Sequence, residues 1–135
     1  MTTTIPAIEF VFALPSRLLS PNGSQRNWHA RREAKAAYRY ACYIEALQVR
    51  RRLEAQGVTF PLPVPVTAHT TFSYKVARAR DEDNLGAMLK GLWDGLRDAK
   101  VLAADDSASL HHAPLTVVVV PAARACVRVL LEVGA

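Results

Sequence analysis

The sequence contains few cysteines, and none of them stands in a metal-binding or redox arrangement. Its two cysteines, Cys42 and Cys126, are far apart, and neither belongs to a CxxC motif or to a Cys/His ligand pattern. Cysteines without such partners are usually reduced and are buried as small hydrophobic side chains. We therefore expect reduced thiols, no zinc site and a cytosolic protein.

The sequence also lacks a long hydrophobic run. Its longest apolar stretches, residues 114–123 and 125–133, are much shorter than the roughly 20 residues that cross a bilayer as a helix. No positively charged segment followed by an apolar one marks a signal peptide. With 135 residues, half of them hydrophobic, the chain is long enough to form one core, so we expect a single domain over residues 1–135.

Acidic residues are outnumbered by basic ones. There are 12 Asp and Glu against 17 Lys and Arg, which gives a net charge of +5. Such a chain is attracted to polyanions, although net charge does not distinguish DNA from RNA or from an acidic protein. Basic residues concentrate in segments 26–52 and 75–80 and acidic ones in 81–106, which indicates a basic surface around an acidic pocket.

The first half of the sequence predicts a strand, a long helix and a second strand. Residues 8–14 are apolar, β-branched and aromatic, as in a strand. Residues 27–56 contain no proline or glycine and predict a helix that stops at Gly57. After a proline-rich connector, residues 66–75 predict the second strand. The apolar residues at helical spacing in the long helix are Ala37, Ala41, Ile44 and Leu47.

The second half predicts another helix and two more strands. Six apolar residues with helical spacing form a core-facing stripe of about four turns, Leu85, Met88, Leu89, Leu92, Trp93 and Leu96. Residues 115–120 and 126–133 predict two strands joined as a hairpin by 121–125. The resulting order, β-α-β-α-β-β, predicts an α+β fold with both helices packed on one face of a mixed sheet.

Acidic residues flank the predicted second helix. Asp81 and Asp83 point the same way if their segment is extended, so they can converge on one cation. The pair Asp105 and Asp106 follows the helix, and a β-α-β path would return it beside the first pair. Mg²⁺ prefers carboxylate and water oxygens, and phosphoryl-transfer enzymes often use two such ions to activate water and stabilise the leaving oxygen.

Lys90 provides a cation near these acids. On a continuous helix it lies on nearly the same side as Asp83, where it could stabilise charge on a phosphate or orient water. Asp94, one turn later, could hold Lys90 in place. A structural explanation also exists, because Asp-x-Asp before a helix serves as a cap, and Lys90 with Asp94 is an ordinary surface pair.

Taken together, these residues resemble the RusA family of Holliday-junction resolvases, the crossover junction endodeoxyribonucleases. The family pattern is D-x-D-N-L, then K, then D-x-L, then D-D. The matching segments here are Asp81-Glu82-Asp83-Asn84-Leu85, Leu89-Lys90, Asp94-Gly95-Leu96, Val101 and Asp105-Asp106-Ser107. Lys90 lies about one helical turn further along than the family pattern usually places its lysine.

The resemblance implies a homodimeric bacterial or phage nuclease of DNA recombination and repair. Such an enzyme binds four-way DNA junctions and uses Mg²⁺ or Mn²⁺ to cut symmetrically related strands, leaving 5′-phosphate and 3′-hydroxyl ends. Carried over by position, Asp81, Asp83 and Asp106 bind the metal and Lys90 assists catalysis. Asp106 is preferred to Asp105 because of its order within the pair.

Several basic and aromatic residues are candidates for DNA contact. Those that could bind phosphates are Arg32, Lys35 and Arg39 on the first helix and Lys75, Arg78 and Arg80 before the acids. A solvated helix face explains the first set equally well. Trp28, Phe72 and Tyr74 could stack on bases, although aromatic residues at such positions usually belong to a core or an interface.

Other functions remain open at this point. The same chemistry would suit a nuclease for flaps or forks, since nothing in the acidic cluster specifies four-way geometry. A branched-DNA-binding protein without cleavage would use the acids only as caps. A regulatory interaction protein of phage or mobile-element origin would instead have a protein partner and no metal dependence.

Overall fold

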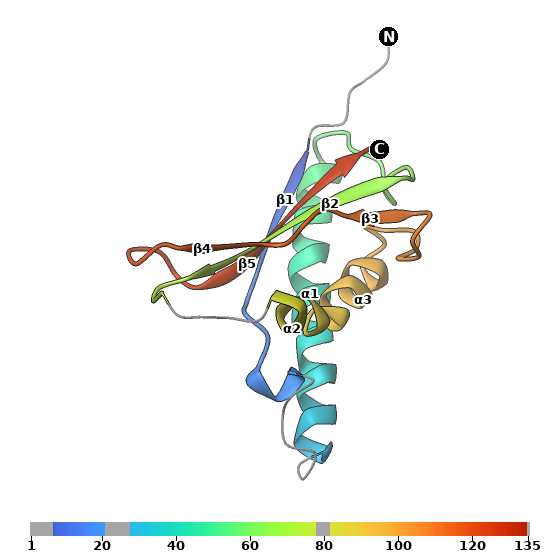
Figure 1. The fold of residues 1–135 in the computed structure, drawn as a ribbon. Helices are drawn as coiled ribbons and strands as arrows, with labels where there is room; N and C mark the ends of the chain where they lie inside the picture. The colour runs from blue at the N-terminus through green and yellow to red at the C-terminus, as the bar shows by residue number, and fades with distance from the viewer. Residues whose placement is uncertain (1–6, 21–27, 78–81, 135) are drawn as a thin grey trace.

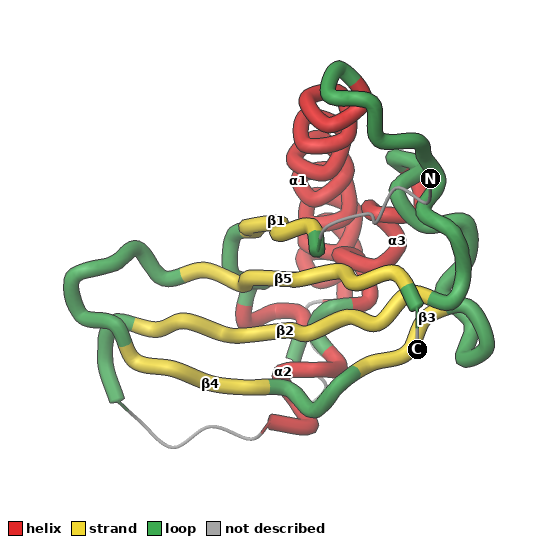
Figure 2. The backbone as a smooth tube through the Cα atoms, turned by 90° about the horizontal axis from the view of Figure 1, so that it is seen from above, coloured by secondary structure: helices red, strands yellow, loops and turns green. Residues whose placement is uncertain are grey.

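The fold is organised around one central strand. The computed structural model describes residues 7–20, 28–77 and 82–134, and its sheet of five strands is centred on β2 (Val66–Tyr74). β5 (Cys126–Val133) pairs antiparallel with β2, and β1 (Ile8–Phe12) pairs antiparallel with β5. On the other side of β2, β3 (Leu110–His112) and β4 (Thr116–Val119) pair in parallel with its beginning and its end (Figure 2).

Three helices cover one face of this sheet: α1 (Trp28–Glu54), α2 (Glu82–Ala87) and α3 (Lys90–Asp98), as Figure 1 shows. Alternate residues along β1, β2 and β5 point toward the helices and are buried, as expected for half-buried strands. Phe10 and Phe72, both fully buried, lie in the core between the layers. The beginning of α1 extends beyond the sheet, and a short 3-10 helix, Arg17–Leu19, precedes it.

The long first helix was predicted almost to its ends, but its buried side was not. Ala37 and Ala41 are exposed. The buried residues of α1 are Tyr38, Cys42, Ala46 and Val49. Small and apolar residues occur on more than one side of this helix, so packing against α3 and β1 decides which side is buried rather than spacing alone.

The predicted second helix is divided into α2 and α3. At Met88 and Leu89 the backbone tightens, because the N–H of Leu89 donates to the carbonyl of Gly86, three residues back, at 3.2 Å. Glycine in this region lowers helix propensity, which favours a break. The core stripe is nevertheless confirmed, since Leu85, Leu89, Leu92 and Leu96 are all buried. The residues around the break keep the apolar side turned toward the core.

The predicted hairpin of the last two strands is wrong. β4 and β5 do not pair with each other, because β2 lies between them and pairs with both. A further strand, β3, also precedes β4. The observed order is therefore β-α-β-α-α-β-β-β, and the broader prediction of an α+β fold with helices on one face of a mixed sheet is confirmed.

Two sequence predictions about composition have structural counterparts. Cys42 and Cys126 are both free and buried. Burial raises the pKa of the Cys42 thiol to about 12, so at neutral pH it is a packing residue and not a nucleophile. In the described ranges, no helix is both long and apolar enough to cross a membrane.

Candidate nucleic-acid interface

The structure describes the predicted acidic cluster only in part. Asp81, Arg78 and Arg80 lie outside the described residues, and so do the side chains of Glu82 and Asp83. The backbone of Glu82 and Asp83 forms the first turn of α2, so the alternation of an extended segment does not apply to Asp83. Its convergence with Asp81 on one cation stays a prediction.

Asp106 lies in the loop between α3 and β3, where its carboxylate organises the turn that starts β3. Oδ1 accepts hydrogen bonds from the backbone N–H groups of Ala108 and Ser109, each at 3.0 Å, and Oδ2 accepts one from the Ser109 hydroxyl at 3.1 Å. These bonds, the hydroxyl of Ser109 first, hold the pKa of Asp106 below its usual range. The carboxylate is therefore ionised at neutral pH, and Oδ2 keeps a lone pair for a cation.

Among the described side chains, the hydrogen bonds of Asp106 stay within its own loop. β3, which follows Asp106, pairs with the first residues of β2, whereas α2 follows the last residue of β2 in the chain. Figures 1 and 2 both show the loop before β3 apart from α2. Asp105 accepts a hydrogen bond from Arg97 at 3.1 Å. Within residues 7–20, 28–77 and 82–134, no group of three His, Cys, Asp or Glu could hold a metal ion.

Lys90 is the first residue of α3 and is exposed. The break at Met88 and Leu89 interrupts the continuous helix on which its placement beside Asp83 was based, so that placement stays a prediction. Asp94 does not pair with it but with Arg39 at 3.8 Å and Arg97 at 3.6 Å. The predicted Lys90–Asp94 pair is therefore absent from this structure.

Lys90 lines a groove between α1 and the α2–α3 pair, which we call the phosphate groove. Its volume is about 410 Å³, and its charged lining residues are Arg32, Lys35, Arg39, Lys90 and Asp94. Its remaining wall is apolar or small and includes Ala36, Met88 and Gly91. The structure thus brings Lys90 together with the three α1 cations that the sequence proposed as phosphate contacts.

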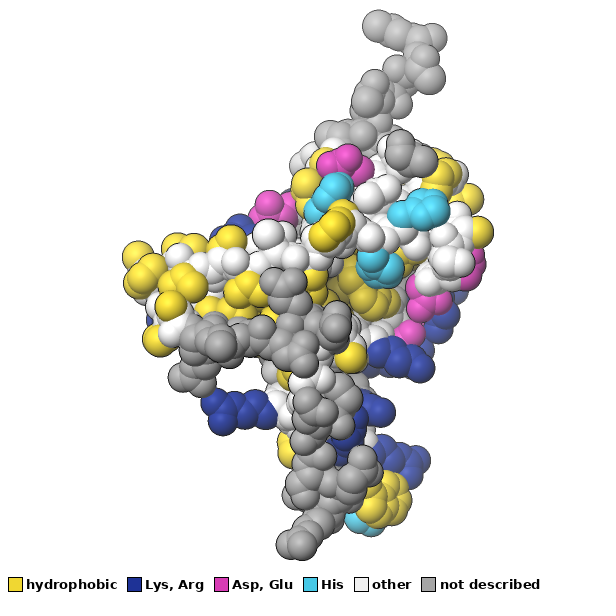
Figure 3. All heavy atoms as spheres, in the orientation of Figure 1, with side chains coloured by type: hydrophobic (Ala, Val, Ile, Leu, Met, Phe, Trp, Pro, Cys, Tyr) yellow, Lys and Arg dark blue, Asp and Glu magenta, His cyan; other side chains and the backbone are white. Residues whose placement is uncertain are grey.

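Among the described residues, the cations of the phosphate groove outnumber its acids. Arg39 is held by Asp98, with two hydrogen bonds of 2.7 and 2.9 Å. Among the described side chains, Arg32, Lys35 and Lys90 form no ion pair. In Figure 3, Lys and Arg side chains gather around the part of α1 that extends beyond the sheet. A row of such cations fits the negative charge of a nucleic-acid backbone.

A second groove lies on the other side of Arg39, and sequence reasoning missed it. Its volume is about 630 Å³, and it shares Ala36 and Arg39 with the phosphate groove. Its other lining residues are Tyr40, Tyr43, Arg97, Asp98, Lys100 and Ala103. Tyr40 directly follows Arg39 on α1. The sequence did not predict its exposure, because the spacing of apolar residues suggested a different buried side of α1 from the one observed.

The remaining predicted contacts are scattered. Lys75 is exposed and lines a separate hollow next to Arg17 and Tyr74. Phe72 is fully buried, which excludes it from stacking on a base. Trp28 is exposed at the beginning of α1 and stacks on His29, with ring centroids 3.9 Å apart.

No protein-family model matches the sequence, and no curated protein matches it significantly. The resemblance to RusA resolvases therefore rests on the motif residues of the sequence alone.

Proposed function

We propose that the protein is a metal-dependent endonuclease for branched DNA, with four-way junctions as its substrate. The observation that carries this proposal is the phosphate groove, where Lys90 of the acid–lysine motif lies with Arg32 and Lys35 and no described acid pairs with these cations. The groove supports binding of a DNA backbone. Cleavage is supported by the motif Asp81-x-Asp83 with Asp106.

In this proposal the cations align the DNA and the carboxylates provide the reaction centre. Mg²⁺, or Mn²⁺ in its place, held by Asp81, Asp83 and Asp106 would supply an activated water for attack on the phosphodiester, leaving 5′-phosphate and 3′-hydroxyl ends. Lys90 stabilises negative charge on the phosphate. Lys75, Arg78 and Arg80 contact the neighbouring backbone. A homodimer has two such centres, which suits paired nicks in recombination and repair.

A second candidate function is binding of branched DNA without cleavage. It is favoured by the position of Asp106, whose carboxylate already holds the turn before β3 and whose loop lies apart from α2. In this case the acids are structural and the grooves provide all of the affinity.

Cleavage assays with matched variants separate the two functions. Labelled four-way junction, fork and linear duplex are incubated with wild type, Asp83→Asn, Asp106→Asn and Asp105→Asn, in Mg²⁺ and in EDTA. We expect symmetric Mg²⁺-dependent nicks in the junction from wild type and Asp105→Asn, and intact binding but no nicks from the other two variants. Asn at position 106 retains a side-chain oxygen that can hold the turn.

Three results would change the proposal. Nicking that depends on Asp105 instead of Asp106 would move the third ligand to Asp105. Equal cutting of forks would broaden the substrate to branched DNA in general. Tight junction binding by wild type without nicks in either Mg²⁺ or Mn²⁺ would exclude the nuclease and leave the DNA-binding function.

A further inference from the structure

The groove on the far side of Arg39 differs from the phosphate groove because its wall is aromatic. Tyr40 is 65% exposed, although large aromatic side chains are usually more buried than this. Its ring lies 6.2 Å from that of Tyr43, with an angle of 46° between the two planes. Tyr43 packs partly against the core and so supports Tyr40 from below. An exposed ring held in this way is a surface on which another ring can stack.

Two of the three cations of this groove are paired with acids, so it is less suited to a run of phosphates than the phosphate groove is. Arg39 is paired with Asp98, and Arg97 is paired with Asp105 at 3.1 Å and with Asp94 at 3.6 Å. These pairs present both hydrogen-bond donors and acceptors beside the exposed ring. A nucleobase has the same combination, a flat face for stacking and an edge with donors and acceptors.

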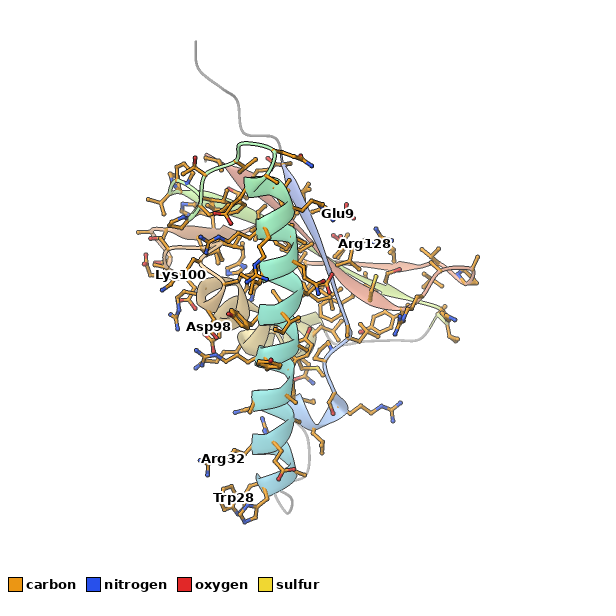
Figure 4. The ribbon with its side chains drawn as sticks, turned by 180° about the vertical axis from the view of Figure 1, so that it is seen from behind. Glu9, Trp28, Arg32, Asp98, Lys100 and Arg128 are labelled. Carbon is orange, nitrogen blue, oxygen red and sulfur yellow. The ribbon has the colours of Figure 1, made fainter. Side chains whose placement is uncertain are left out.

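Lys100 adds a positive charge at the rim of this groove. It follows α3 with a φ of 62°, the one positive value among the described residues other than glycine. Within the described part of the chain it forms no ion pair. Figure 4 shows Lys100, Asp98 and Arg32 along the same side of α1. The rim therefore continues the cationic surface of the phosphate groove.

We propose that this second groove binds the base of an unpaired nucleotide, which stacks on Tyr40 while the phosphates of the same strand lie in the phosphate groove. The two grooves share Ala36 and Arg39, so adjacent parts of one strand can occupy them together. A base inside a duplex is stacked on its neighbours and has no free face for Tyr40. This inference rests on the proposed DNA function and specifies its ligand as single-stranded DNA, such as the segment that opens at a branch point.

Binding experiments with Tyr40 variants test the proposal. Fluorescence anisotropy in EDTA compares wild type, Tyr40→Ala and Tyr40→Phe on a labelled oligothymidylate and on a hairpin duplex with the same number of phosphates. Tyr40→Ala should weaken binding of the single strand about tenfold, in line with the loss of one base–aromatic stack, and change duplex binding less than about twofold. Tyr40→Phe should bind both as wild type does, because phenylalanine keeps the ring.

Val11→Ala is the matched control, since Val11 is another exposed large hydrophobic residue but lies outside the groove. It should leave the preference for single strands unchanged. The proposal is overturned if Tyr40→Ala leaves single-strand binding unchanged, if it weakens both ligands equally, or if wild type binds no single strand. Thermal unfolding of each variant shows that the fold is intact.

The two proposals can fail separately because binding is measured without metal. Metal-dependent junction cleavage together with single-strand binding that is unchanged in Tyr40→Ala would overturn only the proposal for the second groove. Binding of single strands through Tyr40 without any cleavage would overturn the nuclease alone. Failure to bind either DNA ligand would overturn both.

Discussion

The phosphate groove and the loop that carries Asp105 and Asp106 differ in whether their charged side chains already have partners among the described residues. In the groove, Arg32, Lys35 and Lys90 have no acidic partner among the described side chains. In the loop, both carboxylates already accept hydrogen bonds within the protein. Cations without a partner among the described acids can bind an anionic ligand, so within the described part of the chain the groove is the better supported binding surface of the two.

The largest change in stability and DNA affinity is expected from a substitution of Gly95, because this residue sets how closely α3 approaches α1. A Cβ atom there would lie 2.8 Å from the backbone nitrogen of Tyr43 and 2.9 Å from Cβ of Cys42. Gly95→Ala should therefore push the helices apart, lower the free energy of unfolding by about 1–3 kcal/mol and weaken DNA binding, because both grooves lie along this contact. Urea unfolding and anisotropy measure the two effects.

Gly86→Ala is the matched control for this change. A Cβ atom at Gly86 meets nothing within 4 Å, and alanine favours a helix by up to about 1 kcal/mol over glycine. We expect unchanged or slightly raised stability and unchanged DNA affinity. If Gly95→Ala were as stable as Gly86→Ala, the close approach of α1 and α3 would not control the grooves.

A smaller effect is expected from removing single cations of the phosphate groove. Lys35→Ala and Lys90→Ala should each weaken DNA binding several-fold at low salt, and each should reduce the slope of log K against log salt by about 0.9 if one phosphate contact is lost. Arg51→Ala removes the same charge from an exposed position elsewhere on α1. A loss with Arg51→Ala as large as with Lys35→Ala would show that net charge and not the groove determines affinity.

The sequence predicted local features of the fold better than it predicted long-range ones. The strand 126–133 and the buried residues of the Leu85–Leu96 stripe were predicted because alternation and helical spacing are local patterns. The pairing of β4 with β2 was not predicted, because a strand pattern carries no information about which strand lies beside it.

The candidate site shows the same division. The sequence suggested Arg32 and Lys35 as phosphate contacts, and the structure adds Lys90 to them through the folding of α3 beside α1. The sequence did not predict that Asp94 pairs with Arg39 and Arg97, nor that Tyr40 is exposed in a groove. These features depend on the break at Met88 and Leu89 and on the rotation of α1, both of which are decided by tertiary packing.

The smallest expected effect is a loss of folding stability at low pH, and it comes from the loop that carries Asp106. The hydrogen bonds from Ser109 and Ala108 hold the pKa of Asp106 below the usual value of about 3.9. A lowered pKa in the folded state gives stability that is present above the unfolded pKa and is lost as the pH falls through the folded pKa. The loss should therefore begin below about pH 4, in the range where Asp98, paired with Arg39, also protonates.

Asp106→Asn removes this titration while it keeps an oxygen for the turn. Its Tm should fall less steeply than that of wild type between about pH 4 and pH 2, by no more than a few degrees, because Asp106 is exposed to solvent. The same pair of proteins tests the role of the loop at neutral pH. Mg²⁺ should raise the Tm of wild type but not of Asp106→Asn if Asp106 binds the ion, whereas a purely structural Asp106 gives no such difference.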